Sequence, residues 1–192
     1  ALYNGRGGAE VVAGMAAGWA IGNLFMLLFG GIQVSATVIV GGSLGANRLD
    51  EARDRARWIQ SGSVVAGGVV TLLATSSLLI IPVVFGNLTP SARTVARGLI
   101  AVIAVYLPLW ALLNAQYAVS RSGGDMMMGF LADAATTFII FLPAAFLLAL
   151  FTPIGPVALY ALVKTSDFLK LGVARWWLKK EKWVRNLAQP LS

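Results

Sequence analysis

The chain has 192 residues, of which 58% are hydrophobic and 12% are charged, and it carries a net charge of +7. A soluble domain contains about 25% charged residues, so the composition excludes an ordinary soluble protein. With no Cys and no His, a disulfide framework and the commonest metal ligands are excluded, and we expect no metal site, no cofactor and no catalytic residue set. The basic residues flank apolar segments, which argues against a nucleic-acid partner.

Five apolar segments follow one another along the chain. A helix needs roughly 20 apolar residues to cross a bilayer core of about 30 Å. Residues 11–43, 58–89 and 98–120 contain no charged side chain, and residues 126–151 and 154–173 contain few. The sequence therefore predicts an all-α membrane protein in contact with the lipid bilayer. Its bundle of five transmembrane helices is expected at about 9–42, 58–86, 92–121, 124–151 and 156–181.

Small residues and prolines add detail to these helices. Gly14, Gly18 and Gly22 form a ladder on which another helix can pack closely, either as a static contact or as a sliding surface. Gly30 and Gly31 predict a bend in the first helix. Pro108 in the third helix and Pro143 in the fourth each remove a backbone donor, so both are expected to kink their helices.

The charged segment 47–57 lies between the first two apolar segments. Asn47 is a possible N-cap, and Asp50 and Glu51 follow where a helix dipole favours anions. Glu51 and Arg55 are spaced for an i,i+4 ion pair. These features predict a short surface helix over 47–57.

Lys and Arg are distributed unequally between the two sides. Ten lie in the loops after the first and third helices and in the tail, and three (Arg6, Arg93 and Arg97) lie on the other side. The positive-inside rule then places the N-terminus outside and the C-terminus, with a tail at 188–192, in the cytoplasm. The expected location is the bacterial cytoplasmic membrane.

Two intramembrane acids, Asp133 and Asp167, are the candidates for ion coupling. Each is expected roughly 12–13 Å from the cytoplasmic edge, counted along the helix. A carboxylate at such depth is costly, so it should pair, take up a proton or bind a cation. Pairing with Lys164 or Lys170 is the alternative to a coupling role.

Polar side chains on the first and third helices are candidates for binding a substrate. Amides and aromatic rings beside a kink would suit an amphiphilic organic cation. The alternative is hydrogen bonding between helices, which is worth about 0.6–2 kcal/mol in membranes. The candidates are Asn23, Gln33, Asn114, Gln116 and Tyr117.

Two motifs extend the analysis to a family. The segment 38–47 (VIVGGSLGAN), with Gly41 and Gly45, and the segment Arg121-Ser122-Gly123-Gly124-Asp125 resemble motifs of the multidrug and toxic compound extrusion (MATE) family. The opening at 3–8 and the ending at 182–187 fit as well, so the resemblance covers nearly the whole chain. Gly42 replaces the usual Gln of the first motif, and Met126 replaces the Thr that follows the second.

The resemblance implies that the five helices correspond to the eighth to twelfth of a twelve-helix transporter. Residues 1–187 would form most of its C-terminal lobe, and the partner would be an N-terminal lobe that this chain does not contain. Relatives of this kind are antiporters that export small amphiphilic drug-like molecules in exchange for sodium ions or protons. A lipid-linked saccharide flippase of the same superfamily and a non-transporting membrane subunit are the alternatives.

Overall fold

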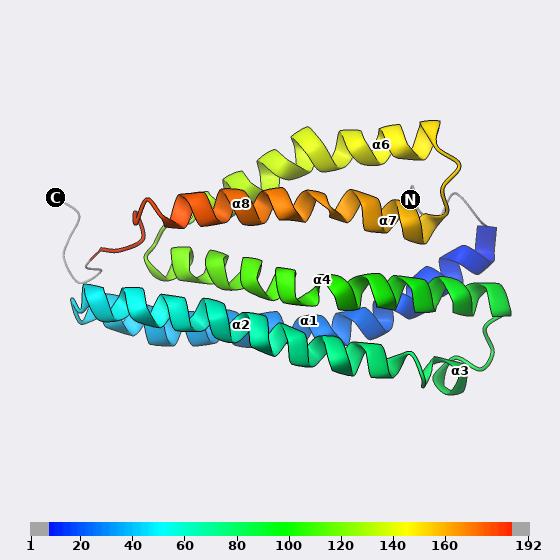
Figure 1. Cartoon of the computed structure of the whole chain (residues 1–192), viewed down its shortest axis with the longest axis horizontal. Coiled ribbons are helices and arrows are strands. Elements are labelled where there is room, and N and C mark those ends of the chain that lie inside the picture. Colours follow the sequence, from blue (N-terminus) through cyan, green and yellow to red (C-terminus); the bar gives the residue numbers. More distant parts are fainter. Residues whose placement is uncertain (1–7, 186–192) are drawn as a thin grey trace. The chain divides into compact units, whose positions relative to one another are not determined.

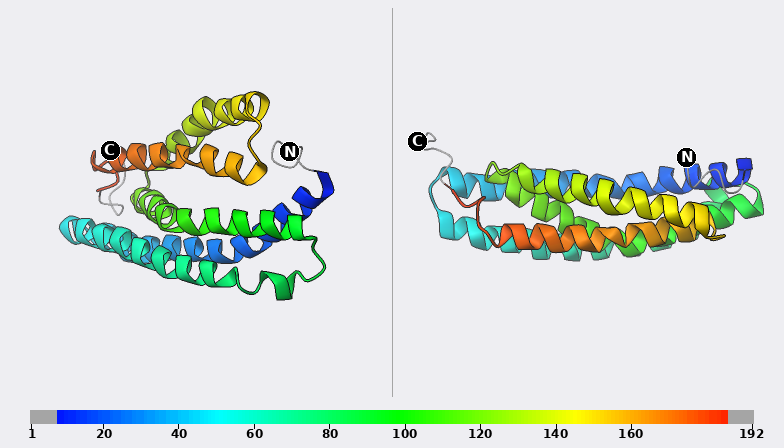
Figure 2. Two further views of the ribbon diagram at one scale, coloured as in Figure 1. Left: turned by 45° about the vertical axis from the view of Figure 1, so that its right-hand side comes forward. Right: turned by 90° about the horizontal axis from the view of Figure 1, so that it is seen from above.

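The computed structural model describes residues 8–185, and every regular element in that range is helical (Figure 1). The expectations for segments 3–7 and 186–192 lie outside the described residues. The α-helices are α1 (Gly8–Gly45), α2 (Leu49–Ser77), α3 (Ile81–Val84), α4 (Pro90–Ser122), α5 (Met127–Phe130), α6 (Leu142–Phe151), α7 (Pro156–Lys164) and α8 (Ser166–Leu178). Two π-helical turns, η2 (Leu131–Ala135) and η3 (Thr137–Phe141), join α5 to α6. Figure 2 shows the same elements from two further directions.

The prediction of an all-α membrane protein is confirmed. Four helical stretches are long and apolar enough to cross a membrane, namely 8–45, 49–77, 90–122 and 127–151. The fifth expected helix, 156–181, is divided at Thr165 into α7 and α8. The Thr165 N–H bonds the Leu162 carbonyl at 3.1 Å, an i→i−3 bond that tightens the chain and ends α7.

The expected proline effects differ between the two helices. Pro108 lies inside α4, which remains one helix from Pro90 to Ser122. Pro143 lies in the first turn of α6, directly after the π-helical turn η3. A proline cannot donate the i→i−4 hydrogen bond. In the wider π turn before it, backbone groups bond over five residues instead of four.

The prediction of a separate surface helix over 47–57 is wrong. Residues 49–57 are the first turns of α2, because no Gly or Pro interrupts the helix before the apolar segment begins. Asn47 ends α1 instead of capping the next helix: it has a φ of 58°, and its N–H bonds the Leu44 carbonyl at 3.1 Å. The Arg48 N–H bonds the Ser43 carbonyl at 2.9 Å, which completes a Schellman cap. The expected Glu51–Arg55 ion pair is present.

The Arg121–Asp125 motif has the same structural role at the end of α4. Gly124 adopts a φ of 76°, and the N–H groups of Gly124 and Asp125 bond the carbonyls of Arg121 and Ser120 at 2.8 and 3.0 Å. A Cβ on Gly123 would overlap the backbone of Trp183, so this position requires glycine. The motif therefore caps α4, and its glycine lets the backbone of the segment after α8 pack directly against it.

By its internal contacts the chain divides into two compact units, which we describe separately. Of the described residues, the first comprises 8–26, 68–107 and 137–166. In it, the glycine ladder of α1 packs directly on α4: a Cβ on Gly14 would meet Ala92 and Val95, and one on Gly22 would meet Ile103. The Thr71 hydroxyl donates to the Ala104 carbonyl at 2.8 Å and ties α2 to α4.

The second unit comprises, of the described residues, 27–67, 108–136 and 167–185. Here the end of α1 and the beginning of α2 lie side by side (Figures 1 and 2), and Arg55 of α2 donates to the Ser43 hydroxyl of α1 at 2.9 Å. The core draws on α1, α2, α4, α5, η2, α8 and the segment after α8. It comprises Val40, Leu44, Ala52, Ala56, Leu113, Tyr117, Val119, Met128, Ala132, Ala174, Leu178 and Trp183.

The glycine ladder gives a test of packing within the first unit. We expect Gly14→Ala to destabilise the protein by about 1–3 kcal/mol, because the new methyl group overlaps the α4 backbone. Gly30→Ala is the matched control in the same helix, since nothing lies within 4 Å of a Cβ there. That change should stabilise the helix by roughly 0.5–1 kcal/mol. Thermal unfolding in detergent measures both, and equal midpoints for the two variants would contradict this account of the ladder.

Candidate functional site

A cluster of charged side chains in the second unit joins the two predicted acids through one lysine. The Lys170 ammonium of α8 lies 3.1 Å from an Asp133 oxygen and 3.6 Å from an Asp167 oxygen. Only 13% of the Lys170 side chain is exposed. The structure thus brings Asp133 and Asp167 to one lysine, and the pairing with Lys170 that was the alternative to a coupling role is present.

Asp167 is the buried member of this cluster. Its side chain is 3% exposed and lies in the first turn of α8, where the helix dipole stabilises a carboxylate. The indole N–H of Trp110 on α4 donates to its Oδ2 at 2.7 Å. No local pattern indicates this bond, because its two residues lie 57 positions apart along the chain.

Asp133 is the accessible member. It lies in the π-helical turn η2, and its side chain is 56% exposed. The Tyr117 hydroxyl donates to its Oδ1 at 3.3 Å, and Lys170 donates to the same atom. A π turn inside a helix is frequently found at a functional site, because it redirects a side chain and frees backbone groups.

The five predicted substrate residues separate into distinct places. Gln33 of α1 donates to the Asn114 side chain at 3.3 Å, and Asn114 donates to the Trp110 carbonyl at 2.9 Å. Tyr117 belongs to the acid cluster, and Asn23 lies exposed in the first unit. Gln33, Asn114 and Tyr117 therefore make the interhelical hydrogen bonds that were the alternative to substrate binding.

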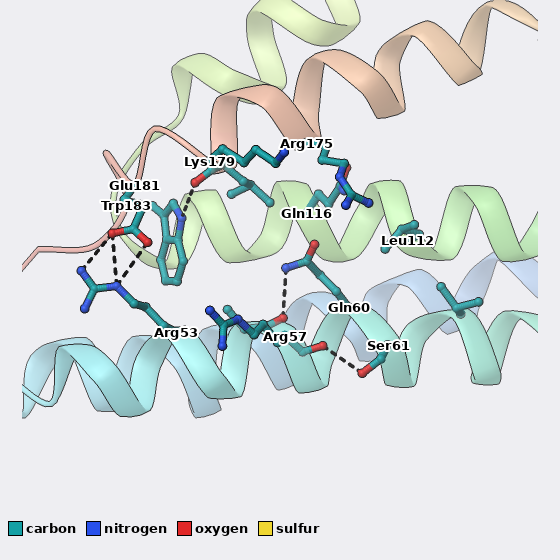
Figure 3. Close-up of a pocket in the computed structure, with 13 residues that line it drawn as sticks. Arg53, Arg57, Gln60, Ser61, Leu112, Gln116, Arg175, Lys179, Glu181 and Trp183 are labelled. Atoms are coloured by element: carbon teal, nitrogen blue, oxygen red, sulfur yellow. Dashed lines mark hydrogen bonds and ion pairs between the residues drawn. The ribbon is translucent and has the colours of Figure 1, made fainter.

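A second polar region of the second unit was missed by the sequence analysis. It is a cavity of about 520 Å³ between α2, α4 and α8 (Figure 3). Its polar lining consists of Arg53, Arg57, Gln60, Ser61, Gln116, Arg175, Lys179 and Glu181. The i,i+4 spacing of Arg53 with Arg57, and of Arg175 with Lys179, is the signal that could have located it.

The motif residues lie at the end of the second unit where α4 meets α8. The Asp125 carboxylate accepts the Trp177 indole N–H at 2.7 Å and the Met127 backbone N–H at 3.2 Å. Arg121 donates to the Tyr117 carbonyl at 3.4 Å. The two glycines of the other motif are less confined: a Cβ on Gly41 would lie 3.9 Å from Ser122, and one on Gly45 would meet nothing within 4 Å. These residues cap and join helices rather than forming a binding site.

The comparison with family models decides the family. The model described as MatE matches residues 1–147. The chain belongs to the MatE family. It is therefore a membrane-embedded member of a family of transporters. None of the curated proteins and none of the solved structures matches this MatE chain.

The Trp110–Asp167 hydrogen bond gives a test of the geometry of this MatE site. Trp110→Phe keeps the ring but removes the donor to a buried carboxylate, so we expect a loss of about 1–3 kcal/mol in the free energy of unfolding. Trp58→Phe is the matched control, because Trp58 is 79% exposed. Equal stability of the two variants in a detergent unfolding titration would show that the indole is not the donor that Asp167 needs.

Proposed function

We propose that this chain is part of a secondary-active multidrug antiporter that exports amphiphilic organic cations in exchange for sodium ions or protons. The observation that carries the proposal is the sharing of Lys170 between Asp133 and Asp167. With both acids ionised and the lysine charged, the three side chains sum to one negative charge. One proton or one sodium ion would neutralise that charge, which is what exchange with an organic cation needs.

The two acids have different roles in this proposal. Asp133 is exposed and, within residues 8–185, is held only by Lys170 and Tyr117, so a coupling ion could reach it. Asp167 is buried and holds the lysine in reach through its own contact. A cation that binds Asp133 competes with the ammonium group of Lys170, which can retain Asp167 as its partner. The coupling ion and Lys170 would thus alternate at one carboxylate.

The neighbouring side chains suit an organic cation. Trp110 and Tyr117 bring aromatic rings to the acid cluster, and Asn114 lies one helical turn from Trp110. Rings attract a cation through their faces, and amides fix its orientation. In this proposal Asn114 and Gln33 form the amide part of the site, and a bound cation would replace the hydrogen bond that now joins them. Gln116 lies in the wall of the basic cavity instead, and Asn23 lies in the first unit.

The arrangement of the whole transporter belongs to the same proposal. The chain would supply the eighth to twelfth helices of the C-terminal lobe, with an N-terminal lobe as its partner across the substrate path. The family match and the four apolar helices support this reading. The bilayer would be the bacterial cytoplasmic membrane, with the basic end of the second unit facing the cytoplasm.

Replacing Asp133 tests the coupling role. Asp133→Asn in the full-length transporter should abolish drug export and leave membrane abundance near normal. Lys170 keeps Asp167 at 3.6 Å, so the change does not strand a buried cation. Asp133→Glu, which keeps the charge, should retain part of the export. The assays are drug efflux from cells and immunoblots of the membrane fraction.

Asp54→Asn is the control for removing an acid elsewhere. Asp54 lies in the first turns of α2 and pairs only with the exposed Arg57 at 3.3 Å in the described structure, so export should be unchanged. Wild-type export by Asp133→Asn, or a fall in abundance that accounts for its whole loss of export, would reject the coupling role.

Single cysteines test the proposed orientation, because the natural chain has none. Asn87 follows α3 and Lys180 follows α8, both are exposed, and the proposed topology assigns them to opposite sides of the membrane. In intact cells an impermeant maleimide should label Asn87→Cys and leave Lys180→Cys unlabelled until the cells are lysed. Labelling of Lys180→Cys in intact cells would contradict the proposed topology.

The basic cavity favours a second candidate function, a lipid-linked saccharide flippase. Arg and Lys side chains recognise a pyrophosphate through charge-assisted hydrogen bonds, and four basic residues line this cavity. Proteoliposomes separate the candidates: when an organic cation is added outside, an antiporter releases protons or preloaded sodium ions from the lumen into the medium, whereas a flippase exposes a lipid pyrophosphate on the far leaflet. The negative acid cluster favours the antiporter.

A further inference from the structure

The cavity between α2, α4 and α8 carries an excess of positive charge. Arg53 and Arg57 of α2 and Arg175 and Lys179 of α8 line it, with Glu181 as the acid of the lining. Figure 3 shows Arg175 extending from α8 and Gln60 extending from α2 toward the space between the two helices. All of these residues belong to the second unit.

Two of the four basic side chains are already neutralised by acids. Arg53 donates to both Glu181 oxygens, at 2.9 Å for the closest contact. Arg57 lies 3.3 Å from Asp54. Arg175 and Lys179, by contrast, have no side-chain hydrogen bond or ion pair with any residue from 8 to 185. These two cations therefore remain available at the cavity wall.

A buried amide lies in the same wall. Gln116 of α4 is 3% exposed, and its Oε1 has no hydrogen-bond partner within the described part of the chain. A buried polar group without a partner is costly, so it points to a ligand or to water in the space that it lines. Rotation of the amide about its last bond presents its NH₂ group to an anion instead.

The surroundings combine apolar and interfacial surfaces. Val64 and Leu112 line the cavity beside the basic residues. Trp58 and Trp176 are 79% and 56% exposed on the helices that border it, and exposed Trp side chains gather at the headgroup level of a bilayer. The cavity therefore offers basic side chains to the charged headgroup of a lipid and apolar side chains to its acyl chain.

We propose that this cavity is a binding site for a phosphate group, supplied by the headgroup of an anionic phospholipid. Arg175 and Lys179 hold the phosphate oxygens, Gln116 donates through its amide, and Val64 and Leu112 contact the start of an acyl chain. This site goes beyond the proposed antiport and does not depend on it, because none of these residues belongs to the acid cluster. Soluble phosphate has the same chemistry and is the other source.

Native mass spectrometry of the full-length protein in detergent tests the site. Palmitoyl-oleoyl phosphatidylglycerol is the probe, the phosphatidylcholine with the same chains is the neutral comparison, and inorganic phosphate is the competitor. We expect one phosphatidylglycerol to be retained in preference to phosphatidylcholine. Replacing both Arg175→Gln and Lys179→Gln should lower its affinity about tenfold or more, since each basic residue near a membrane surface contributes about 1 kcal/mol.

The matched control is Lys180→Gln with Lys182→Gln. It removes the same charge from the same segment, but these lysines lie over the rings of Trp176 and Trp177 and do not line the cavity. Gln116→Leu, which keeps every charge, should also weaken binding. Equal losses in the two double variants, or no preference for phosphatidylglycerol, would overturn the site. Displacement of the lipid by millimolar phosphate would overturn the lipid as its source.

Discussion

The contact on which the candidate site depends is the sharing of one lysine between two carboxylates. Charged groups inside a bilayer are costly unless they are paired. Lys170 lies within 4 Å of both Asp133 and Asp167, so none of the three charges lacks an opposite charge nearby. The Trp110 indole and the Tyr117 hydroxyl supply further donors.

Irregular backbone accompanies this cluster at both acids. Asp133 lies in a π-helical turn, and Asp167 follows the break at Thr165 where α7 ends and α8 begins. Within a membrane such irregularity persists where neighbouring protein groups satisfy the freed backbone. The Thr165 hydroxyl illustrates this, since it donates to the Leu162 carbonyl at 2.6 Å. The widened turn lets Asp133 face Lys170 of the neighbouring helix α8, and the helix start places Asp167 one turn before the same lysine.

Left-handed residues end three helices of the second unit and shape the other polar region. Asn47, Gly124 and Glu181 have φ values of 58°, 76° and 50°, after α1, α4 and α8 respectively. The turn at Glu181 brings its carboxylate to Arg53 and its neighbour Trp183 against the core. The basic cavity therefore owes part of its lining to the same turn that ends α8.

Apolar segments without charges were enough to predict an all-α membrane protein, since the cost of burying charge in lipid leaves a strong pattern. The membrane depth expected for Asp133 and Asp167 from the helical rise stays a prediction. The break at Thr165 did not follow, because an i→i−3 bond needs no Gly or Pro to mark it. The hydrogen bond of Trp110 to Asp167 and the place of Gln116 in the cavity wall depend on which faces of distant helices meet. A single sequence does not encode that in a local pattern.

The central claim is that the acid cluster exchanges one small cation for one organic cation, and ion release on drug binding tests it most directly. The purified full-length transporter in weak buffer, or loaded with radioactive sodium, is titrated with an organic cation. The account predicts that about one proton or one sodium ion is released per organic cation bound, in keeping with a cluster of one net negative charge. It also predicts no release from the Asp133→Asn protein. Equal release from both proteins would contradict the account.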